Sequence, residues 1–305
     1  MTICLIDADV LTYQCAFAGQ FKDEQSGELV MKDFDAVEEM LTLKIREITE
    51  ECMSDEEPLL FLTGDATLAN HLNRRPKWVE PLEKIELRPS FRYEEATTKV
   101  YKGTRKADKP LHYDNIRAYM LAVYNCVVSD KLEADDMLAI YQTTANGYND
   151  PAIADTIICS VDKDLRQVPG KHYSWSIGSR PGKPVYEVDE FGTMELAGKP
   201  KKLSATGLRS LFAQALMGDT VDNIQGIEGM GPVKAYEILC ESITEMELFL
   251  ATARAYRDKY PENWQEKLRE SLDLVYMIRE VDSDGNAIRY KYPEGWELLL
   301  DHKAL

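Results

Sequence analysis

The chain has 305 residues, of which 44% are hydrophobic, and this suffices for one large α/β domain or two smaller ones. Its formal net charge of −17 argues at face value against a nucleic-acid partner, although acids gathered in a few motifs account for about half of the excess. The six cysteines are scattered without a CxxC pair, so their spacing predicts neither a disulfide framework nor a zinc site. The N-terminus lacks the pattern of a signal peptide, and no apolar stretch approaches bilayer length, so we expect a cytoplasmic protein.

Short apolar runs alternate with helical patterns along the first half of the chain. The strand-like runs cover residues 3–11, 58–65, 124–130 and 155–164. Helical patterns at 35–51 and 134–145 lie between them. This alternation predicts an α/β fold with a mostly parallel sheet and crossover helices. Residues 171–200 are β-rich in pattern, the chain from 204 to about 270 is mainly helical, and the aromatic stretch YKYPEGWELLL has no predicted function.

A basic segment interrupts the acidic chain at residues 66–115. Between Ala66 and Pro110 it holds eleven Lys and Arg residues against six acids. Aromatic residues are interleaved with them: Trp78, Phe91, Tyr93, Tyr101 and Tyr113. Cations and aromatic rings together suit single-stranded or splayed nucleic acid, because bases stack on rings and phosphates need cations. A solvated surface loop is an equally good interpretation of this segment alone.

Carboxylates gather where apolar runs end. Asp7, Asp65 and Asp162 fall toward the C-terminal ends of their runs, which is the edge where open α/β sheets bind ligands. Carboxylates held together repel one another unless a cation neutralises them, and oxygen ligands favour Mg²⁺ or Mn²⁺. The nine candidate metal ligands are Asp7, Asp65, Glu133, Asp135, Asp136, Asp162, Asp164, Asp219 and Asp222.

Two of these motifs leave their local geometry open. In SVDKDL, the two-residue period of a strand would place Asp162 and Asp164 on one side. In KLEADDM, extended backbone would unite Glu133 with Asp135, whereas helical backbone would unite Glu133 with Asp136. The alternative is that these acids only decorate the N-terminus of the following helix.

The stretch GDTVDNIQGIEGMGPVKAYEIL combines an acid pair with a glycine-rich turn. Asp219 and Asp222 are three residues apart and would share one face of a helix. Pro232 suits the first position of a second helix. A helix–hairpin–helix arrangement of this kind leaves backbone N–H groups free to bind a phosphate. An ordinary turn between two helices would explain the glycines but not the adjacent acids. The glycines of the turn are Gly226, Gly229 and Gly231.

In order and content these motifs resemble the 5′→3′ exonuclease/flap endonuclease family, in particular the small bacteriophage 5′ nucleases and the 5′ nuclease domain of bacterial DNA polymerases. The resemblance spans roughly residues 3–240 and rests on LIDAD, Asp65, SFRYEEATTKVYKGTRK, LEADD, SVDKD and GDTVDNIQGIEGMGPVKA. It implies a PIN-like, Rossmann-like nuclease core at 1–203 with a helical arch at 66–115. A helix-hairpin-helix region at 204–250 and an extension packed on the core at 251–305 would follow. The stretch before the SFRYEE segment is longer than usual, so an enlarged arch is expected.

The resemblance also implies residue roles. Asp7, Asp65, Glu133 and Asp135 would hold one ion, with Asp135 between the two ions, and Asp162, Asp164 and Asp219 would hold the second. Asp136 and Asp222 match family acids that act through water, and Asp9 would at most support a ligand. Lys102 and Arg105 would act on the scissile phosphate. DNA contacts would come from Tyr101, Lys102, Arg105, Lys106, Gly226, Gly229, Gly231 and Lys234. Backbone carbonyls of Gly226, Ile227, Gly229 and Gly231 would bind K⁺.

The activity implied is metal-dependent hydrolysis of DNA at 5′ ends, flaps or nicks with two Mg²⁺ or Mn²⁺ ions, in phage replication, repair or recombination. A monomer that works with replication proteins is expected, and the balance between exonuclease and flap endonuclease activity stays open. One alternative is a PIN-type ribonuclease, which the hairpin disfavours because it suits duplex DNA. The other is a non-catalytic DNA-binding accessory protein, which would predict gaps in the acid set.

Overall fold

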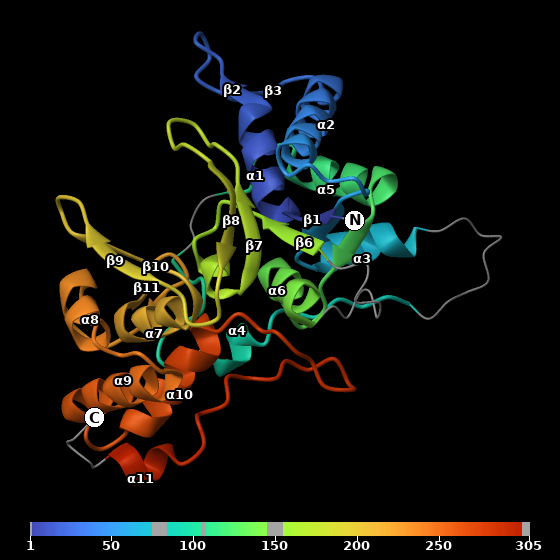
Figure 1. Cartoon of the computed structure of the whole chain (residues 1–305). Coiled ribbons are helices and arrows are strands. Elements are labelled where there is room, and N and C mark those ends of the chain that lie inside the picture. Colours follow the sequence, from blue (N-terminus) through green and yellow to red (C-terminus); the bar gives the residue numbers. More distant parts are fainter. Residues whose placement is uncertain (1, 75–83, 105–107, 145–154, 301–305) are drawn as a thin grey trace.

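A six-stranded sheet forms the centre of the first two thirds of the chain (Figure 1). The computed structural model describes residues 2–74, 84–104, 108–144 and 155–300. The strand order is β5-β4-β1-β6-β7-β8, with parallel pairing from β5 to β7 and antiparallel pairing of β8. These strands are β1 (Thr2–Asp7), β4 (Leu59–Leu62), β5 (Cys126–Val128), β6 (Asp155–Cys159), β7 (Gly170–Ser174) and β8 (Lys183–Val188). The predicted mostly parallel α/β sheet is therefore confirmed.

Helices cover both faces of this sheet, as a parallel sheet requires. Cys4 and Ile6 of β1 face one apolar cluster together with α1 (Ala8–Ala18), α2 (Phe34–Glu51) and α5 (Tyr113–Val123). Ile3 and Leu5 face the other cluster, under α6 (Ala134–Thr144) and the 3₁₀ turn η1 (Asp164–Gln167). The strict alternation along β1 explains why its sequence is apolar on both sides. The remaining helices of this part are α3 (Ala66–Asn73) and α4 (Arg92–Glu95).

A second apolar core belongs to the helical part of the chain. It combines residues of α7 (Gly207–Met217), α8 (Pro232–Leu239), α9 (Glu245–Lys259) and α10 (Trp264–Val275). Aromatic residues of the C-terminal stretch pack against α9: Tyr292 and Trp296 both contact Phe249. The C-terminal aromatic stretch, for which the sequence predicts no function, thus completes this core together with α11 (Trp296–Leu300). Two small antiparallel pairs complete this part: β9 (Met194–Ala197) with β10 (Lys202–Ala205), and β11 (Gly218–Asp219) with β12 (Ile224–Gln225).

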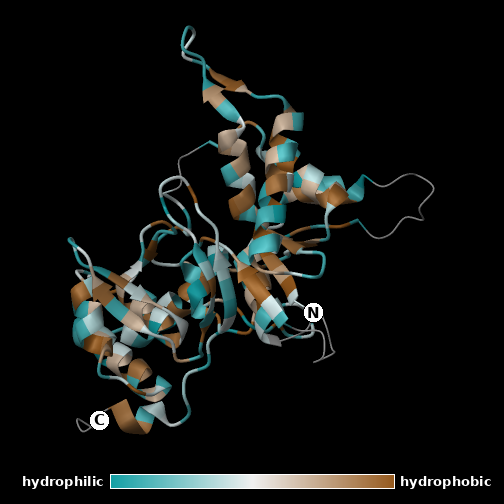
Figure 2. Cartoon of the chain, turned by 45° about the horizontal axis from the view of Figure 1, so that its top comes forward, coloured by the Kyte–Doolittle hydropathy of each residue, from teal (hydrophilic) through white to brown (hydrophobic). Residues whose placement is uncertain are grey.

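A narrow hairpin projects from the sheet part beyond α1 (Figures 1 and 2). It pairs β2 (Gln20–Lys22) with β3 (Leu29–Met31). Its apolar side chains Phe21, Leu29 and Met31 are exposed. Figure 2 colours parts of the projecting strands brown, as hydrophobic. No helix in the described part of the chain is long and apolar enough to span a membrane.

Two expectations about local structure were wrong. The apolar run 3–11 does not stay extended, because the Asp7 side chain accepts the N–H of Val10 and begins α1 at Ala8. Asp219 and Asp222 share a turn between β11 and β12 instead of a helical face, since Asp219 accepts the N–H groups of Val221 and Asp222. The expected boundaries near 203 and 250 cut β10 and α9, so they do not coincide with breaks between elements.

Candidate metal centre

Seven of the nine predicted acids line two adjoining cavities at the C-terminal ends of β1 and β6. The cavities, of about 330 and 590 Å³, share the side chains of Lys102, Glu133, Asp135 and Asp162. The smaller one adds Asp164, Asp219 and Asp222, and the larger one adds Asp7. Neither Asp65 nor Asp136 is among the described residues that line them. The sheet edge therefore gathers acids from segments more than 200 residues apart in the sequence.

Asp7 anchors the centre from the end of β1. Its carboxylate is 1% exposed, with Oδ1 accepting the N–H of Val10 at 3.0 Å and Oδ2 accepting the Ser160 hydroxyl at 2.6 Å. Burial, with added repulsion from Asp9 and Asp162, raises the pKa of Asp7 to about 7 despite these two hydrogen bonds. Asp9 is turned toward β4 and accepts the N–H of Thr63 at 3.2 Å. Asp7 is thus a buried acid that a cation would strongly favour in its charged form.

Glu133 and Asp135 enter the cavities together from the start of α6. Glu133 accepts a hydrogen bond from the Tyr101 hydroxyl at 2.8 Å and forms an ion pair with the Lys102 ammonium. Burial would raise the pKa of Glu133, but Lys102 and the nearby Arg92 outweigh it and hold that pKa below its usual value. Burial and the charges of Asp7, Asp162 and Glu133 raise the pKa of Asp135 well above its usual value. The backbone of KLEADDM is helical from Ala134 on, and Asp136 accepts the Glu133 N–H as helical geometry predicts. The side chains of Glu133 and Asp135 nevertheless line the cavities together.

Asp164 and Asp219 form the other end of the smaller cavity. The Lys163 ammonium lies 2.7 Å from Asp219 Oδ2 and 3.4 Å from Asp164 Oδ1. Burial and the charge of Asp162 raise the pKa of Asp164 to about 7, although Lys163 acts in the opposite direction. The Gln214 amide also donates to Asp164, and the Asp162 carboxylate accepts the N–H of Asp164 at 2.8 Å. Asp162 and Asp164 are therefore held together by a tight turn rather than by a continuing strand.

Asp65 stands apart from the cavities and has its own cationic partners. It begins α3 by accepting the N–H of Leu68 at 2.9 Å, and its other oxygen accepts Arg117 Nη1 at 2.6 Å. Lys109 Nζ lies 3.7 Å away. Burial would raise the pKa of Asp65, but Leu68 and Arg117 outweigh it and lower that pKa. A direct ligand role would require Asp65 to share its oxygens with Arg117.

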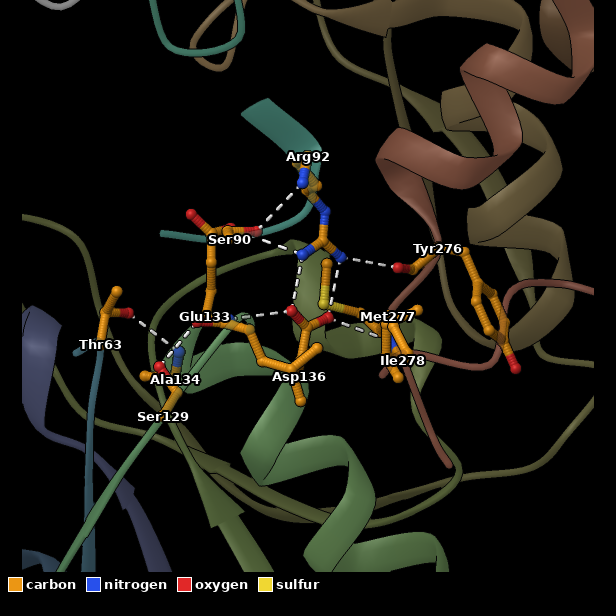
Figure 3. A network of polar contacts seen from close by, with 12 residues as sticks. Thr63, Ser90, Arg92, Ser129, Glu133, Ala134, Asp136, Tyr276, Met277 and Ile278 are labelled. Carbon is orange, nitrogen blue, oxygen red and sulfur yellow. Dashed lines mark hydrogen bonds and ion pairs between the residues drawn. The ribbon is translucent and has the colours of Figure 1, made fainter. Parts of the chain in front are cut away.

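Asp136 lines neither cavity and points to Arg92 (Figure 3). Both of its oxygens meet the Arg92 guanidinium, at 2.6 and 2.8 Å, and both residues are at most 1% exposed. The same two oxygens of Asp136 also accept the N–H groups of Glu133 and Ile278. Arg92 in turn donates to the carbonyls of Leu274 and Tyr276. Asp136 is thus fully used as a structural acid, and we leave it out of the proposed ligand set.

The YKGTR segment is fixed to the cleft by its backbone. Lys102 has φ of +53°, an uncommon conformation for a residue with a side chain, and its N–H donates to the Asp222 carbonyl at 2.8 Å. Tyr101 is only 3% exposed and donates to Glu133, so its ring is buried and unavailable for stacking on a base. Arg105 and Lys106 lie outside the described residues.

The glycine hairpin lies between β12 and α8. Pro232 occupies the first turn of α8 and Gly231 precedes that helix, as predicted. The Ile227 N–H donates to the Leu216 carbonyl, which fixes the start of the hairpin against α7. Lys234 Nζ lies 3.4 Å from the carbonyl of Gly229, one of the carbonyls expected to bind K⁺. A groove of about 770 Å³ adjoins the hairpin and is lined by α8 and α9.

The donor set at the cleft fits hard divalent cations. Every candidate ligand at the two cavities is a carboxylate oxygen, the donor that Mg²⁺ and Mn²⁺ prefer. Asp7, Asp135 and Asp164 all have raised pKa values because of burial and of neighbouring acids. A bound cation would remove this repulsion. Lys102 and Lys163 outweigh burial at Glu133 and Asp219, but Lys163 does not outweigh it at Asp164.

The sequence did not indicate that three further residues belong to the centre. Lys163 was read only as the middle of SVDKD, and Arg92 was counted among basic residues of a nucleic-acid-binding segment. Gln214, which donates to Asp164, lies in an apolar helical pattern with nothing to mark it. A lysine flanked by two aspartates could have suggested a local counter-ion. The ion-pair partners of the Arg92 side chain and the side-chain hydrogen-bond partners of Gln214 are at least 41 residues away, so local patterns could not reveal them.

Known proteins resemble this chain in sequence and in fold. No model of a protein family matches it. DNA polymerase I of Rhizobium leguminosarum is 27% identical over 158 residues, which are 51% of this chain and 14% of that protein. Flap endonuclease Xni of Shewanella halifaxensis is 25% identical over 174 residues, 55% of this chain and 61% of that protein. The chain thus matches less than two thirds of the length of either curated relative.

Among solved structures, the T5 D15 protein co-crystallized with metal ions shares the fold. The similarity covers 91% of this chain and 90% of that one, with a TM-score of 0.50 and 17% sequence identity. This likeness agrees with the PIN-like fold class predicted from the motifs. By the sequence of its motifs and by its fold, this chain resembles the 5′→3′ exonuclease/flap endonuclease family.

Proposed function

We propose that this protein is a metal-dependent 5′ nuclease that hydrolyses DNA phosphodiester bonds near 5′ ends, flaps or nicks. The observation that carries the proposal is the meeting of seven carboxylates with Lys102 and Lys163 around two adjoining cavities. So many buried acids at one point destabilise a fold unless cations bind there. The named relatives, a flap endonuclease and a DNA polymerase I, support a role on DNA.

The proposed ligands divide between the two cavities. Asp7, Glu133 and Asp135 would hold one ion, and Asp162, Asp164 and Asp219 the other, with Asp135 close to both. Asp222 adjoins this set and accepts the Tyr101 hydroxyl at 3.2 Å. Bound divalent ions would supply an activated water and neutralise charge on the scissile phosphate.

The chain's own residues would place and neutralise the phosphate. Lys102 is held over the cleft by its backbone bond to Asp222, so its ammonium can move from Glu133 to a phosphate oxygen without refolding of the loop. Arg105 is proposed for the same task. The start of α8 would offer backbone N–H groups to a phosphate of the duplex, so an acidic protein could bind DNA there.

We propose that the protein is a monomer that acts in replication, repair or recombination of phage DNA. K⁺ would bind at the hairpin carbonyls.

The decisive test is digestion of end-labelled DNA. Duplex, nicked and 5′-flapped substrates of one sequence are compared in Mg²⁺, in Mn²⁺ and in EDTA. We expect cleavage that depends on the metal and leaves 5′-phosphate products, with product lengths separating exonuclease from flap activity. An RNA substrate of the same sequence should be cut poorly, and preferred cleavage of RNA would instead support a PIN-type ribonuclease. No cleavage in either metal would support a non-catalytic DNA-binding protein.

Replacing one central acid tests the ligand assignment. Asp162→Asn should lower the cleavage rate roughly 10²-fold or more, the order expected when one electrostatic group of an active site is lost. DNA binding, measured in Ca²⁺ by fluorescence anisotropy, should be retained or tighter, because one repulsive charge is removed. The matched control is Asp155→Asn at the start of β6, the strand that precedes Asp162; its partially exposed carboxylate pairs with Lys171. Wild-type cleavage by Asp162→Asn would show that the assignment is wrong.

A further inference from the structure

Three thiols meet in the core, away from the carboxylate cleft. Cys4 lies on β1, Cys52 directly follows α2, and Cys159 ends β6. Their sulfur atoms all lie within 4.8 Å of one another, and the residues are 0%, 3% and 0% exposed. None of them lines either cavity of the cleft. All six cysteines of the chain are free thiols, and only these three come together.

The spacing of the sulfur atoms matches that around a metal ion. Two sulfurs bound at about 2.3 Å to a tetrahedral zinc ion lie about 3.8 Å apart. Cys52 Sγ and Cys159 Sγ are 3.7 Å apart, and the separations involving Cys4 exceed the ideal by at most about 1 Å. A disulfide would need a sulfur separation of about 2.05 Å, so the geometry favours a shared ion over a covalent bond.

The three thiols share hydrogen bonds that shift their pKa values in opposite directions. Hydrogen bonds from the thiols of Cys159 and Cys52 lower the pKa of Cys4 to about 4, against the effect of burial, and the Ser54 hydroxyl adds to the lowering. Burial and the bonds shared with Cys4 and Cys52 raise the pKa of Cys159. The bond to Cys159 lowers the pKa of Cys52, but the bond to Cys4 and burial outweigh it and raise that pKa. Ser54 Oγ is itself held in place, because it lies 2.8 Å from the Thr2 carbonyl. The hydroxyl lies within hydrogen-bond reach of Cys4 and offers an oxygen beside the three sulfurs.

We propose that Cys4, Cys52 and Cys159, with the Ser54 hydroxyl, form a buried site for one thiophilic divalent ion of the Zn²⁺ class. A divalent ion is favoured because three thiolates leave one net negative charge around it, whereas a monovalent ion would leave two in an apolar core. Binding replaces up to three S–H bonds by metal–sulfur bonds and releases the protons to solvent, so nothing is oxidised or reduced.

Cys52 lies next to an exposed part of the chain. Cys52 caps the C-terminal end of α2, and Met53 beside it is 85% exposed with φ of +50°. Fraying of one helical turn therefore brings the Cys52 sulfur to solvent without opening the sheet. The bound ion would tie α2 to two central strands of the sheet, β1 and β6, that also carry Asp7 and lead to Asp162. The proposal does not depend on the nuclease function, because no acid of the cleft takes part.

Cobalt reports such a site directly. The full-length, reduced protein is stripped with a chelator and titrated with Co²⁺. We expect thiolate-to-cobalt charge-transfer absorption that saturates at one equivalent and disappears when Zn²⁺ is added. Co²⁺ on the carboxylate centre gives no such band, so Asp162→Asn should keep it. A titration without the charge-transfer band would overturn the proposal.

The variants separate the site from ordinary packing. Cys159→Ala should abolish the band, and so should Cys52→Ala, which lies at a helix end and disturbs the core less. Cys15→Ala is the matched control, because Cys15 is also buried in the same apolar cluster but lies outside the trio. It should keep the band at full amplitude. Circular dichroism verifies that each variant is folded, and an unchanged band in folded Cys52→Ala would contradict the assignment.

Discussion

At the scale of single residues, the cleft holds acids in two different electrostatic states. Burial and neighbouring acids raise the pKa values of Asp7, Asp135 and Asp164. For Glu133 and Asp219 burial acts in the same direction, but bound lysines reverse the result and lower their pKa values. Lys102 and Lys163 therefore hold Glu133 and Asp219 in the charged form, whereas burial outweighs the partners of Asp7, Asp135 and Asp164. This distribution is what a divalent ion can complete.

The raised pKa of Asp7 predicts how pH affects stability without metal. Its folded pKa is about 7 against an ordinary value of 3.8, so the folded state binds more protons than the unfolded state between these values. The contribution of Asp7 is therefore fully present below about pH 4 and is lost as the pH rises to about 7.

The Asp7→Asn variant isolates this contribution, because asparagine resembles the protonated acid. In EDTA at neutral pH, the variant should be more stable than the wild type by about 1–4 kcal/mol, and the difference should shrink toward pH 4. Excess Mg²⁺ should reduce the difference or reverse it. Urea unfolding of both proteins across this pH range measures the effect. A stability difference that is independent of pH in EDTA would contradict the pKa assignment.

At the scale of elements, the candidate functional residues lie where helices and turns begin. Asp7 and Asp65 both begin helices by accepting an N–H three residues ahead, so their positions follow from helix capping. The hairpin before α8 depends on close backbone approach. A Cβ added at Gly226 would lie 2.3 Å from Gly218 N and 2.4 Å from the Leu216 carbonyl oxygen. The same atom at Gly231 would meet nothing within 4 Å.

These two glycines give a matched pair of substitutions. Gly226→Ala should lower the free energy of unfolding by about 1–3 kcal/mol, because the added Cβ would clash with backbone atoms that cannot move independently. DNA binding should weaken with it, since the start of α8 would shift. Gly231→Ala should change the melting temperature little. Calorimetry and fluorescence anisotropy with duplex DNA measure both effects, and equal behaviour of the two variants would count against a structural role of Gly226.

At the scale of the whole molecule, the Arg92–Asp136 pair joins the parts of the chain. Arg92 begins α4 and Asp136 belongs to α6 (Figure 3). The carbonyls that Arg92 also contacts belong to Leu274, in the last turn of α10, and to Tyr276, which directly follows α10. Gln167 makes a parallel connection, because its amide donates to the Val275 carbonyl and to Gln214 of α7. The helical part is thus tied to the acids of the cleft through buried polar contacts.

Breaking the buried pair should be costly. Arg92→Met should lower the free energy of unfolding by about 3–5 kcal/mol, because it leaves a buried carboxylate without its partner. The double variant Arg92→Met with Asp136→Leu should lose less than the sum of the two single losses. Arg88→Met removes the more exposed pair with Asp130 and should cost at most about 1 kcal/mol. Urea unfolding compares the wild type with the two single variants, the double variant and Arg88→Met. A loss of stability in Arg92→Met no larger than that in Arg88→Met would contradict the prediction.

Local sequence patterns predicted much of the fold and most of the centre. Alternating apolar runs indicated the sheet, because each buried strand needs a continuous apolar stretch. The ends of those strands indicated where Asp7 and Asp162 would meet, since parallel strands share one ligand-binding edge. The glycines and Pro232 indicated the hairpin, because few other residues allow that turn. These features depend on neighbours within a few residues, which is why sequence alone determined them.

The tertiary structure decided which members of each pattern reach the cleft. Asp135 faces the cavities while the adjacent Asp136 faces Arg92, and no spacing rule distinguishes them. Tyr101 supports Glu133 from a buried position instead of presenting its ring to DNA. The three thiols come from residues 4, 52 and 159, so a spacing rule for zinc sites could not detect them. Each of these outcomes depends on contacts between segments far apart in the chain, and only folding brings those segments together.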